Sequence, residues 1–192
     1  MKPSRKALLL DRDGVINVNH GYVHHPEDCD FIPGIFSLCA AAQKRGYRII
    51  IVTNQSGIAR RYYSRAQFHA FSRWIEHAFF TRGISIQQTL HCPHHPKESG
   101  AFGFQCCCRK PRAGMIFRAQ RRFHLNLSQS IMVGDSWSDV RCGQHAKIGK
   151  IVHFQDPLLV KAQSTPFTPN LYKVRSRDYY RAKSLRSITR LL

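Results

Sequence analysis

Short apolar runs alternate with segments of helical spacing along most of this sequence, and few folds accommodate such an order. The predicted strands cover residues 7–10, 48–52, 90–91, 131–133 and 150–153. Between them, apolar residues recur every three or four positions over 35–42, 68–79 and 115–123, which predicts amphipathic helices. Such an order predicts strands that pair in parallel. We therefore predict an α/β fold, a three-layer Rossmann-like parallel sheet with helices on both faces.

Polar side chains follow three of these predicted strands. Asp11 ends the first strand, Thr53 follows the second, and Asp135 follows the run at 131–133. Ligands of parallel sheets bind beyond the carboxyl ends of the strands, so we expect these side chains to meet at one site. Carboxylates are scarce in the chain, with 11 Asp and Glu against 30 Lys and Arg, which makes this grouping stand out.

The first acidic cluster reads Asp11-Arg12-Asp13-Gly14. Two acids with this spacing also form ordinary turns, since Asp and Gly both favour loops. The chemical alternative is phosphoryl transfer, in which a carboxylate beside Mg²⁺ attacks phosphorus and forms an aspartyl-phosphate. A second carboxyl two residues later would protonate the leaving oxygen and then activate water.

A segment rich in cysteine and histidine interrupts the alternation at about 92–110. Four of its residues form two pairs with one-residue spacing, Cys92 with His94 and Cys106 with Cys108. Zinc takes four such thiolate and imidazole ligands, and a metal would order a loop that has no apolar core of its own. His95 and Cys107 compete as ligands, but one-residue spacing lets both members of a pair face one ion. Reduced thiols without a metal are the alternative.

We expect one domain over residues 1–192, with a basic appendage at about 161–192 that ends in a short helix. No apolar run approaches the roughly 20 residues of a membrane span, and residues 7–10 are too few for a signal peptide. A cytoplasmic protein without a membrane partner is therefore expected, and we also expect a monomer. The net charge of +19 and the pI near 10.3 indicate a polyanion, or another anion, as partner.

Together the motifs resemble those of haloacid dehalogenase-like phosphatases and, within them, the heptose 1,7-bisphosphate phosphatases. The resemblance runs from about residue 8 to residue 153. It rests on Asp-Arg-Asp-Gly-Val-Ile-Asn at 11–17, His-Gly-Tyr-Val at 20–23, Val-Thr-Asn-Gln-Ser-Gly-Ile-Ala-Arg at 52–60, Cys-Pro-His-His-Pro at 92–96, Cys-x-Cys-Arg-Lys-Pro at 106–111 and Val-Gly-Asp at 133–135.

This resemblance implies a role for each site residue. Asp11 would be the nucleophile, Asp13 the general acid/base, and Thr53 and Lys110 would hold the transferring phosphoryl group. Mg²⁺ would be bound by Asp11, by Asp135 and by the backbone carbonyl of Asp13, while Asp139 orients the site or starts a helix. Substrate contacts would come from Asn19, His20, Gly21, Tyr22, Thr53, Asn54, Gln55, Ser56, Arg109 and Lys110.

The resemblance also implies cofactors and a reaction. Cys92, His94, Cys106 and Cys108 would bind a structural Zn²⁺ in a loop that replaces a cap domain. The reaction would release the 7-phosphate of a small sugar bisphosphate during the synthesis of nucleotide-activated heptose. Nucleic acid is not expected as a partner. Rival functions are a histidinol-phosphate phosphatase, a polynucleotide 3′-phosphatase and, outside catalysis, a zinc-containing nucleic-acid binder.

Four positions depart from the pattern of the resembled family. Arg61 stands where a glycine is usual, and Asn19 stands for a frequent Asp. Cys107 occupies a place where an acid is often found, and Ser136 a place where a lysine is common. We expect the Arg61 departure to alter a tight backbone turn, and the Ser136 departure to weaken phosphate or metal contacts.

Overall fold

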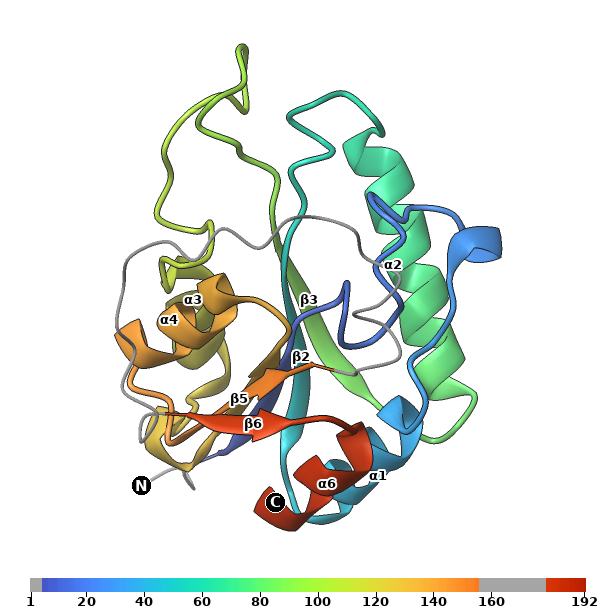
Figure 1. Ribbon diagram of the computed structural model, residues 1–192, viewed down its shortest axis with the longest axis vertical. Helices are drawn as coiled ribbons and strands as arrows, with labels where there is room; N and C mark the ends of the chain where they lie inside the picture. The colour runs from blue at the N-terminus through green and yellow to red at the C-terminus, as the bar shows by residue number, and fades with distance from the viewer. Residues whose placement is uncertain (1–4, 156–178) are drawn as a thin grey trace.

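The strands form one parallel sheet in a computed structural model that describes residues 5–155 and 179–192 (Figure 1). The strands are β1 (Ala7–Leu10), β2 (Arg48–Asn54), β3 (Ile86–Cys92), β4 (Ile131–Gly134), β5 (Lys150–Phe154) and β6 (Tyr180–Ala182). They pair in the order β3-β2-β1-β4-β5-β6, and every pairing is parallel. The predicted α/β sheet is thereby confirmed.

The helices connect these strands. They are α1 (Ile35–Lys44), α2 (Arg65–Phe80), α3 (Gly114–Phe123), α4 (Trp137–His145) and α6 (Leu185–Ile188), with short 3-10 turns at Pro26–Asp28, Leu127–Gln129 and Thr189–Leu191. Ser64 and Gln67 form the capping box that begins α2. None of the helices in the described ranges is long and apolar enough to cross a membrane.

Helices cover both faces of the sheet because alternate strand residues point to opposite sides. In β1, Leu8 and Leu10 belong to the core formed with α1, α2 and α6, whereas Ala7 and Leu9 belong to the core formed with α3 and α4. All four are fully buried. A strand covered on both faces reads as a continuous apolar run, which is why β1 is recognisable from four residues.

The C-terminal segment is not an appendage where the structure describes it, so that expectation is wrong for residues 179–192. β6 pairs with β5 as the edge of the sheet, and α6 packs Leu185 and Ile188 into the core beside α1. The predicted short helix near the C-terminus is confirmed. Residues 161–178 of the predicted basic segment lie outside the described residues.

Candidate active site

A cavity of about 380 Å³ opens at the carboxyl ends of the strands, where the sequence places the site. Its lining includes most of the predicted residues: Asp11, Asp13, Asn19, Gly21, Tyr22, Thr53, Asn54, Gln55, Ser56, Lys110 and Asp135. It also includes Ser136, one of the departures from the family pattern, and Tyr63 and Ser138, which were not predicted. The predicted substrate residues His20 and Arg109 lie outside this lining. His20 pairs with Asp30 on the surface, and Arg109 donates to the carbonyl of His94.

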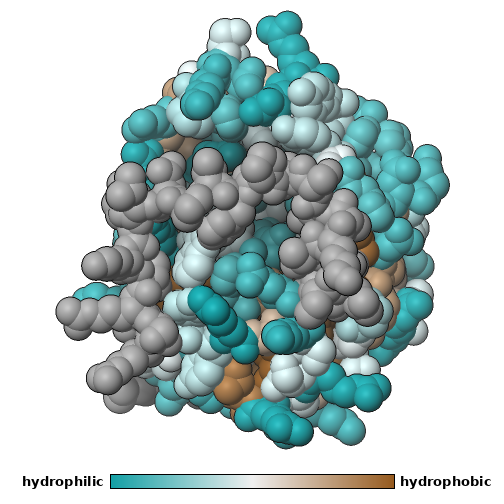
Figure 2. All heavy atoms as spheres, in the orientation of Figure 1, coloured by the Kyte–Doolittle hydropathy of each residue, from teal (hydrophilic) through white to brown (hydrophobic). Residues whose placement is uncertain are grey.

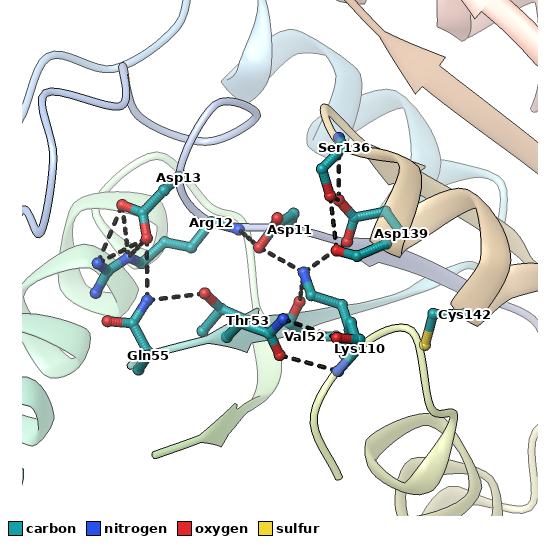
Figure 3. Close-up of polar contacts among 12 residues, drawn as sticks. Asp11, Arg12, Asp13, Val52, Thr53, Gln55, Lys110, Ser136, Asp139 and Cys142 are labelled. Carbon is teal, nitrogen blue, oxygen red and sulfur yellow. Dashed lines mark hydrogen bonds and ion pairs between the residues drawn. The ribbon is translucent and has the colours of Figure 1, made fainter. Parts of the chain in front are cut away.

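Lys110 binds two carboxylates at the base of the cavity (Figure 3). Its Nζ lies 2.8 Å from Oδ1 of Asp11 and 2.6 Å from Oδ1 of Asp139, and it donates to the carbonyl of Val52 at 2.9 Å. Asp139 turns its other oxygen to the backbone N–H and hydroxyl of Ser136, which begins α4. Asp139 therefore has both of its expected roles: it orients Lys110, and it takes part in the capping box that begins α4.

The carboxylates at this point carry more negative charge than one lysine balances. Oxygens of Asp11, Asp135 and Asp139 all lie within 4.8 Å of one another. Burial and the neighbouring Asp139 raise the pKa of Asp11 to about 7, and burial followed by Asp11 raises the pKa of Asp135 well above its usual range. Burial alone would lower the pKa of Lys110, but Asp11 and Asp139 outweigh it and raise that pKa. Hard oxygen donors in such a cluster suit a divalent cation such as Mg²⁺.

Gly14 lets the nucleophile loop approach Asp135. Its φ is +85°, and a Cβ built there would lie 2.0 Å from Oδ2 of Asp135. A side chain at this position would displace that carboxylate, besides straining the backbone. The Asp-x-Asp-Gly motif thus needs its glycine to bring Asp11 and Asp135 into one cluster.

The carboxylate of Asp13 is held apart from this cluster. Arg12, which is buried, pairs with Asp13 at 2.9 Å, while the side-chain amides of Asn17 and Gln55 donate to it at 3.1 and 3.0 Å. Its oxygens do not belong to the group of carboxylates that converge with Asp11. The geometry therefore does not support the Asp13 carboxylate as a Mg²⁺ ligand. The backbone carbonyl of Asp13 stays a candidate ligand, as expected from the sequence.

Tyr63 fixes the orientation of Gln55, and sequence reasoning missed it. The Tyr63 hydroxyl donates to Oε1 of Gln55 at 2.5 Å, so Nε2 faces the cavity and donates to Asp13 and, at 2.8 Å, to Oγ1 of Thr53. Because Thr53 accepts this bond, its own hydroxyl hydrogen is free to donate to a phosphoryl oxygen. The sequence holds only a tyrosine eight residues after the glutamine, and no motif marks this pair as functional.

Replacing Tyr63 with phenylalanine should lower both stability and turnover. A buried Gln55 oxygen left without its donor costs about 1–3 kcal/mol of unfolding free energy, and the amide is free to rotate away from Asp13. Urea unfolding and steady-state phosphate release measure the two effects. Tyr62→Phe is the matched control, since Tyr62 is 55% exposed, and it should change stability by less than about 0.5 kcal/mol. Equal effects of the two substitutions would contradict the role given to Tyr63.

Asn54 anchors Lys110 across 56 residues of chain. Its side-chain oxygen accepts from the Lys110 backbone N–H at 3.0 Å, and its amide donates to the Lys110 carbonyl at 3.2 Å. Asn54 lines the cavity as predicted, but both of these hydrogen bonds join its side chain to the Lys110 backbone and not to a substrate. The position of the lysine is therefore set by the end of β2.

The four predicted thiol and imidazole ligands converge at the end of β3. Sγ of Cys92 lies 3.4 Å from Sγ of Cys106 and 3.3 Å from that of Cys108, and Nδ1 of His94 lies 3.5 and 3.3 Å from Cys92 and Cys108. These spacings are too long for disulfides and leave room for one ion among four soft donors. Cys107 is exposed and outside the cluster, so the choice of its two neighbours agrees with the geometry.

The loop that carries these ligands packs against the segment that follows β2. Phe102 contacts a small cluster of Ile58, Tyr63 and Phe68. Arg60 lies 3.6 Å from Glu98, and Tyr62 packs edge-on against Tyr22 at the mouth of the cavity. We call the loop at about 92–110 the metal loop because it carries the four candidate ligands. It supports one wall of the cavity through Tyr63.

The structure places each departure from the family pattern. Arg61 adopts the left-handed conformation that favours glycine, with φ of 60°, at a cost of about 1–2 kcal/mol. The expectation of an altered turn there stays a prediction. Ser136 caps α4, and Asn19 accepts a hydrogen bond from the backbone N–H of Gly21 at 3.2 Å.

Comparison with known proteins finds relatives that share one enzyme name. A family model described as "HAD-hyrolase-like" matches residues 107–152. The D-glycero-beta-D-manno-heptose-1,7-bisphosphate 7-phosphatase of Vibrio cholerae is 41% identical over 147 residues, covering 76% of this chain and 79% of that protein. The enzyme of the same name from Escherichia coli K12 is 37% identical over 167 residues, covering 85% and 87%.

Two solved structures share the fold. A putative HAD-like phosphatase from Mesorhizobium loti superposes with a TM-score of 0.76 at 32% identity, over 80% of this chain and 74% of the other. The D,D-heptose 1,7-bisphosphate phosphatase from B. bronchiseptica, solved with magnesium and phosphate, has a TM-score of 0.75 at 24% identity and covers 97% of each chain. At that identity the second match speaks for the fold alone.

Proposed function

This chain belongs to the D-glycero-β-D-manno-heptose-1,7-bisphosphate 7-phosphatase family of haloacid dehalogenase-like hydrolases, and we propose on that premise that it releases the 7-phosphate of this sugar bisphosphate. It is a phosphoric monoester hydrolase. The observation that carries the proposal is identity of about 40% with these phosphatases over most of the chain. The names of the relatives favour the β anomer, and nucleotide-activated heptose synthesis would consume the product.

The proposed mechanism uses Asp11 and Asp13 in turn. An oxygen of Asp11 attacks phosphorus in line, and the bond to the sugar oxygen breaks as Asp13 donates a proton to that oxygen. Asp13 then takes a proton from water, whose oxygen attacks the aspartyl-phosphate, releases phosphate and frees Asp11. Arg12, Asn17 and Gln55 hold Asp13 in place through these steps.

Lys110 and Thr53 would stabilise the transferring group. The Lys110 ammonium already contacts Asp11, so a phosphoryl group bound there meets a positive charge held in a buried site. Thr53, whose hydroxyl can donate to a phosphoryl oxygen, lines the same cavity. Mg²⁺, held by Asp11, Asp135 and the carbonyl of Asp13, would neutralise phosphate charge.

We also propose a structural Zn²⁺ at Cys92, His94, Cys106 and Cys108. The support is the convergence of three thiols and one imidazole, a donor set that suits zinc better than a hard cation. Four protein ligands would leave no open position, so the ion would order the loop and take no part in the reaction. A cytoplasmic location and a monomeric state remain predictions.

Phosphate release from four substrates tests the function. Both heptose 1,7-bisphosphate anomers, histidinol phosphate and an oligonucleotide with a 3′-phosphate are compared under Mg²⁺. We expect the highest kcat/KM for the β heptose bisphosphate. Faster release from histidinol phosphate, or from the oligonucleotide, would overturn the substrate assignment while leaving the aspartate chemistry intact.

A further inference from the structure

The end of the molecule opposite the active site is strongly cationic. It is formed by the first residues of the strands and the last residues of the helices that return to them, because the strands are parallel (Figure 1). The cations of this end are Arg5, Lys6, Lys44, Arg45, Arg48, Arg82, Arg121, Arg122, Lys147, Lys150 and Arg190. We call this surface the basal face. In Figure 2 the lower end of the molecule shows mostly hydrophilic side chains around a small hydrophobic patch.

Within the described residues, no Asp or Glu side chain lies at the basal face. Four of the nine described acids belong to the active site, and three lie between β1 and α1, at Glu27, Asp28 and Asp30. Glu98, in the metal loop, pairs with Arg60. Glu76 accepts a hydrogen bond from Thr89, halfway along β3. None of the ion pairs found between described residues involves a cation of the basal face.

Helix ends explain only part of this charge. Cations near helix C-termini offset the helix dipole, and Arg82 donates to the carbonyl of Ala78 at the end of α2 in this way. Arg5, Lys6, Arg48 and Lys150 precede or begin strands, where no such dipole exists. Their interactions within the described residues are with neutral groups: Lys6 lies over the ring of Tyr47, and Lys150 donates to the carbonyl of Leu191.

Two of these arginines line one hollow. A depression of about 400 Å³ is bounded by Arg5 and Arg48 and otherwise by Gln43, Gly46, Tyr47, Ser85 and Gln87. Burial, and then the neighbouring Arg5, lower the pKa of Arg48, and among the described residues neither arginine forms an ion pair with an acid. An anionic group in the hollow would relieve the repulsion between these two arginines, and the amides and hydroxyl around it offer further hydrogen bonds.

We propose that the basal face binds single-stranded RNA through its phosphates. Arginine dominates the face, and its planar fork matches phosphate oxygens better than an ammonium does. Apart from Tyr47 and Gly46, the hollow is lined by polar and charged side chains, which suits phosphates, riboses and base edges better than lipid chains, and the hydrophobic patch of this end is small (Figure 2). Nucleic acid is not expected as a partner from the motifs. Because this face lies away from the phosphatase site, the proposal does not depend on the proposed function.

Fluorescence anisotropy with a labelled 20-nucleotide polyuridine RNA and the full-length chain tests the proposal. Binding should weaken with salt, with a log–log slope of about −2 to −4 for three to five phosphates. Arg5→Glu with Arg122→Glu should weaken binding at least about tenfold at fixed salt. Phosphate release should stay unchanged, because both residues are exposed and distant from the cavity.

Arg65→Glu with Arg73→Glu supplies the matched control. These two exposed arginines lie on α2, outside the basal face, and the pair changes the net charge by the same amount. Thermal unfolding verifies that all variants fold. Equal weakening by both pairs would show that net charge alone, or another segment, binds RNA and would overturn the proposal. Absence of RNA binding, or binding to phosphatidylglycerol vesicles in place of RNA, would overturn it as well.

Discussion

Asp11→Asn should abolish Mg²⁺-dependent phosphate release, with a fall in kcat of at least about 10⁴-fold. The amide cannot attack phosphorus, and Lys110 loses one of its two carboxylate partners while keeping Asp139. The substitution should not lower stability in metal-free buffer. A buried carboxyl with its pKa raised to about 7 favours the folded state at lower pH, and this contribution is lost as pH rises through 7. Asparagine removes the charged form that disfavours folding above pH 7.

Three measurements make this result interpretable. Thermal unfolding without Mg²⁺ at pH 8 should give a melting temperature for Asp11→Asn no lower than that of the unaltered chain. The zinc content should be unchanged, since the thiol cluster lies in a separate loop. Asp28→Asn, an exposed acid with the same change of charge, should retain full activity. Turnover by Asp11→Asn above about a thousandth of the original rate would refute the nucleophile assignment.

Cys106→Ser should release the metal and raise KM more than it lowers kcat. The loop between β3 and α3 has no apolar core, so loss of a ligand frees Phe102 from its contact with the cluster of Ile58, Tyr63 and Phe68. We expect a loss of about 2–4 kcal/mol, which for a chain of this size lowers the melting temperature by about 4–16 °C. Elemental analysis, calorimetry and steady-state kinetics provide the readouts.

Cys107→Ser is the control for this substitution, because it removes an exposed thiol from the same run of three cysteines. It should leave zinc content, melting temperature and KM as they are. A zinc-free protein whose melting temperature and KM match those of the loaded protein would show that the cluster holds no structural ion. Metal loss with kcat reduced and KM unchanged would place the effect at the lysine instead.

The positions of the main site residues follow from sequence because strand ends are easy to locate. β1 is a run of four fully buried apolar residues, and in a parallel sheet its end must lie beside the ends of β2 and β4. Asp11, Thr53 and Asp135 are therefore brought together by topology alone. The thiol ligands follow from spacing, since one-residue gaps in two pairs are rare by chance.

Other features depend on packing that no local pattern records. Beyond a helix start at Asp139, the extent of α4 was not predicted, because its buried positions hold Asp139, Val140, Cys142 and Gly143, which do not form an apolar stripe. β6 has two exposed residues of three, as an edge strand allows. The Tyr63–Gln55 contact joins two loop residues eight positions apart, and Phe102 of the metal loop packs against the cluster that contains Tyr63.

The anchoring of Lys110 by Asn54 separates the reaction centre from the metal loop. Lys110 is hydrogen-bonded to the end of β2, through the Asn54 side chain and the Val52 carbonyl, although in sequence it follows directly on the metal loop. Residues between His95 and Gln105 thus form a module that can change length or composition without moving the charged group at the reaction centre. An engineer could therefore exchange that module while leaving Lys110 in place.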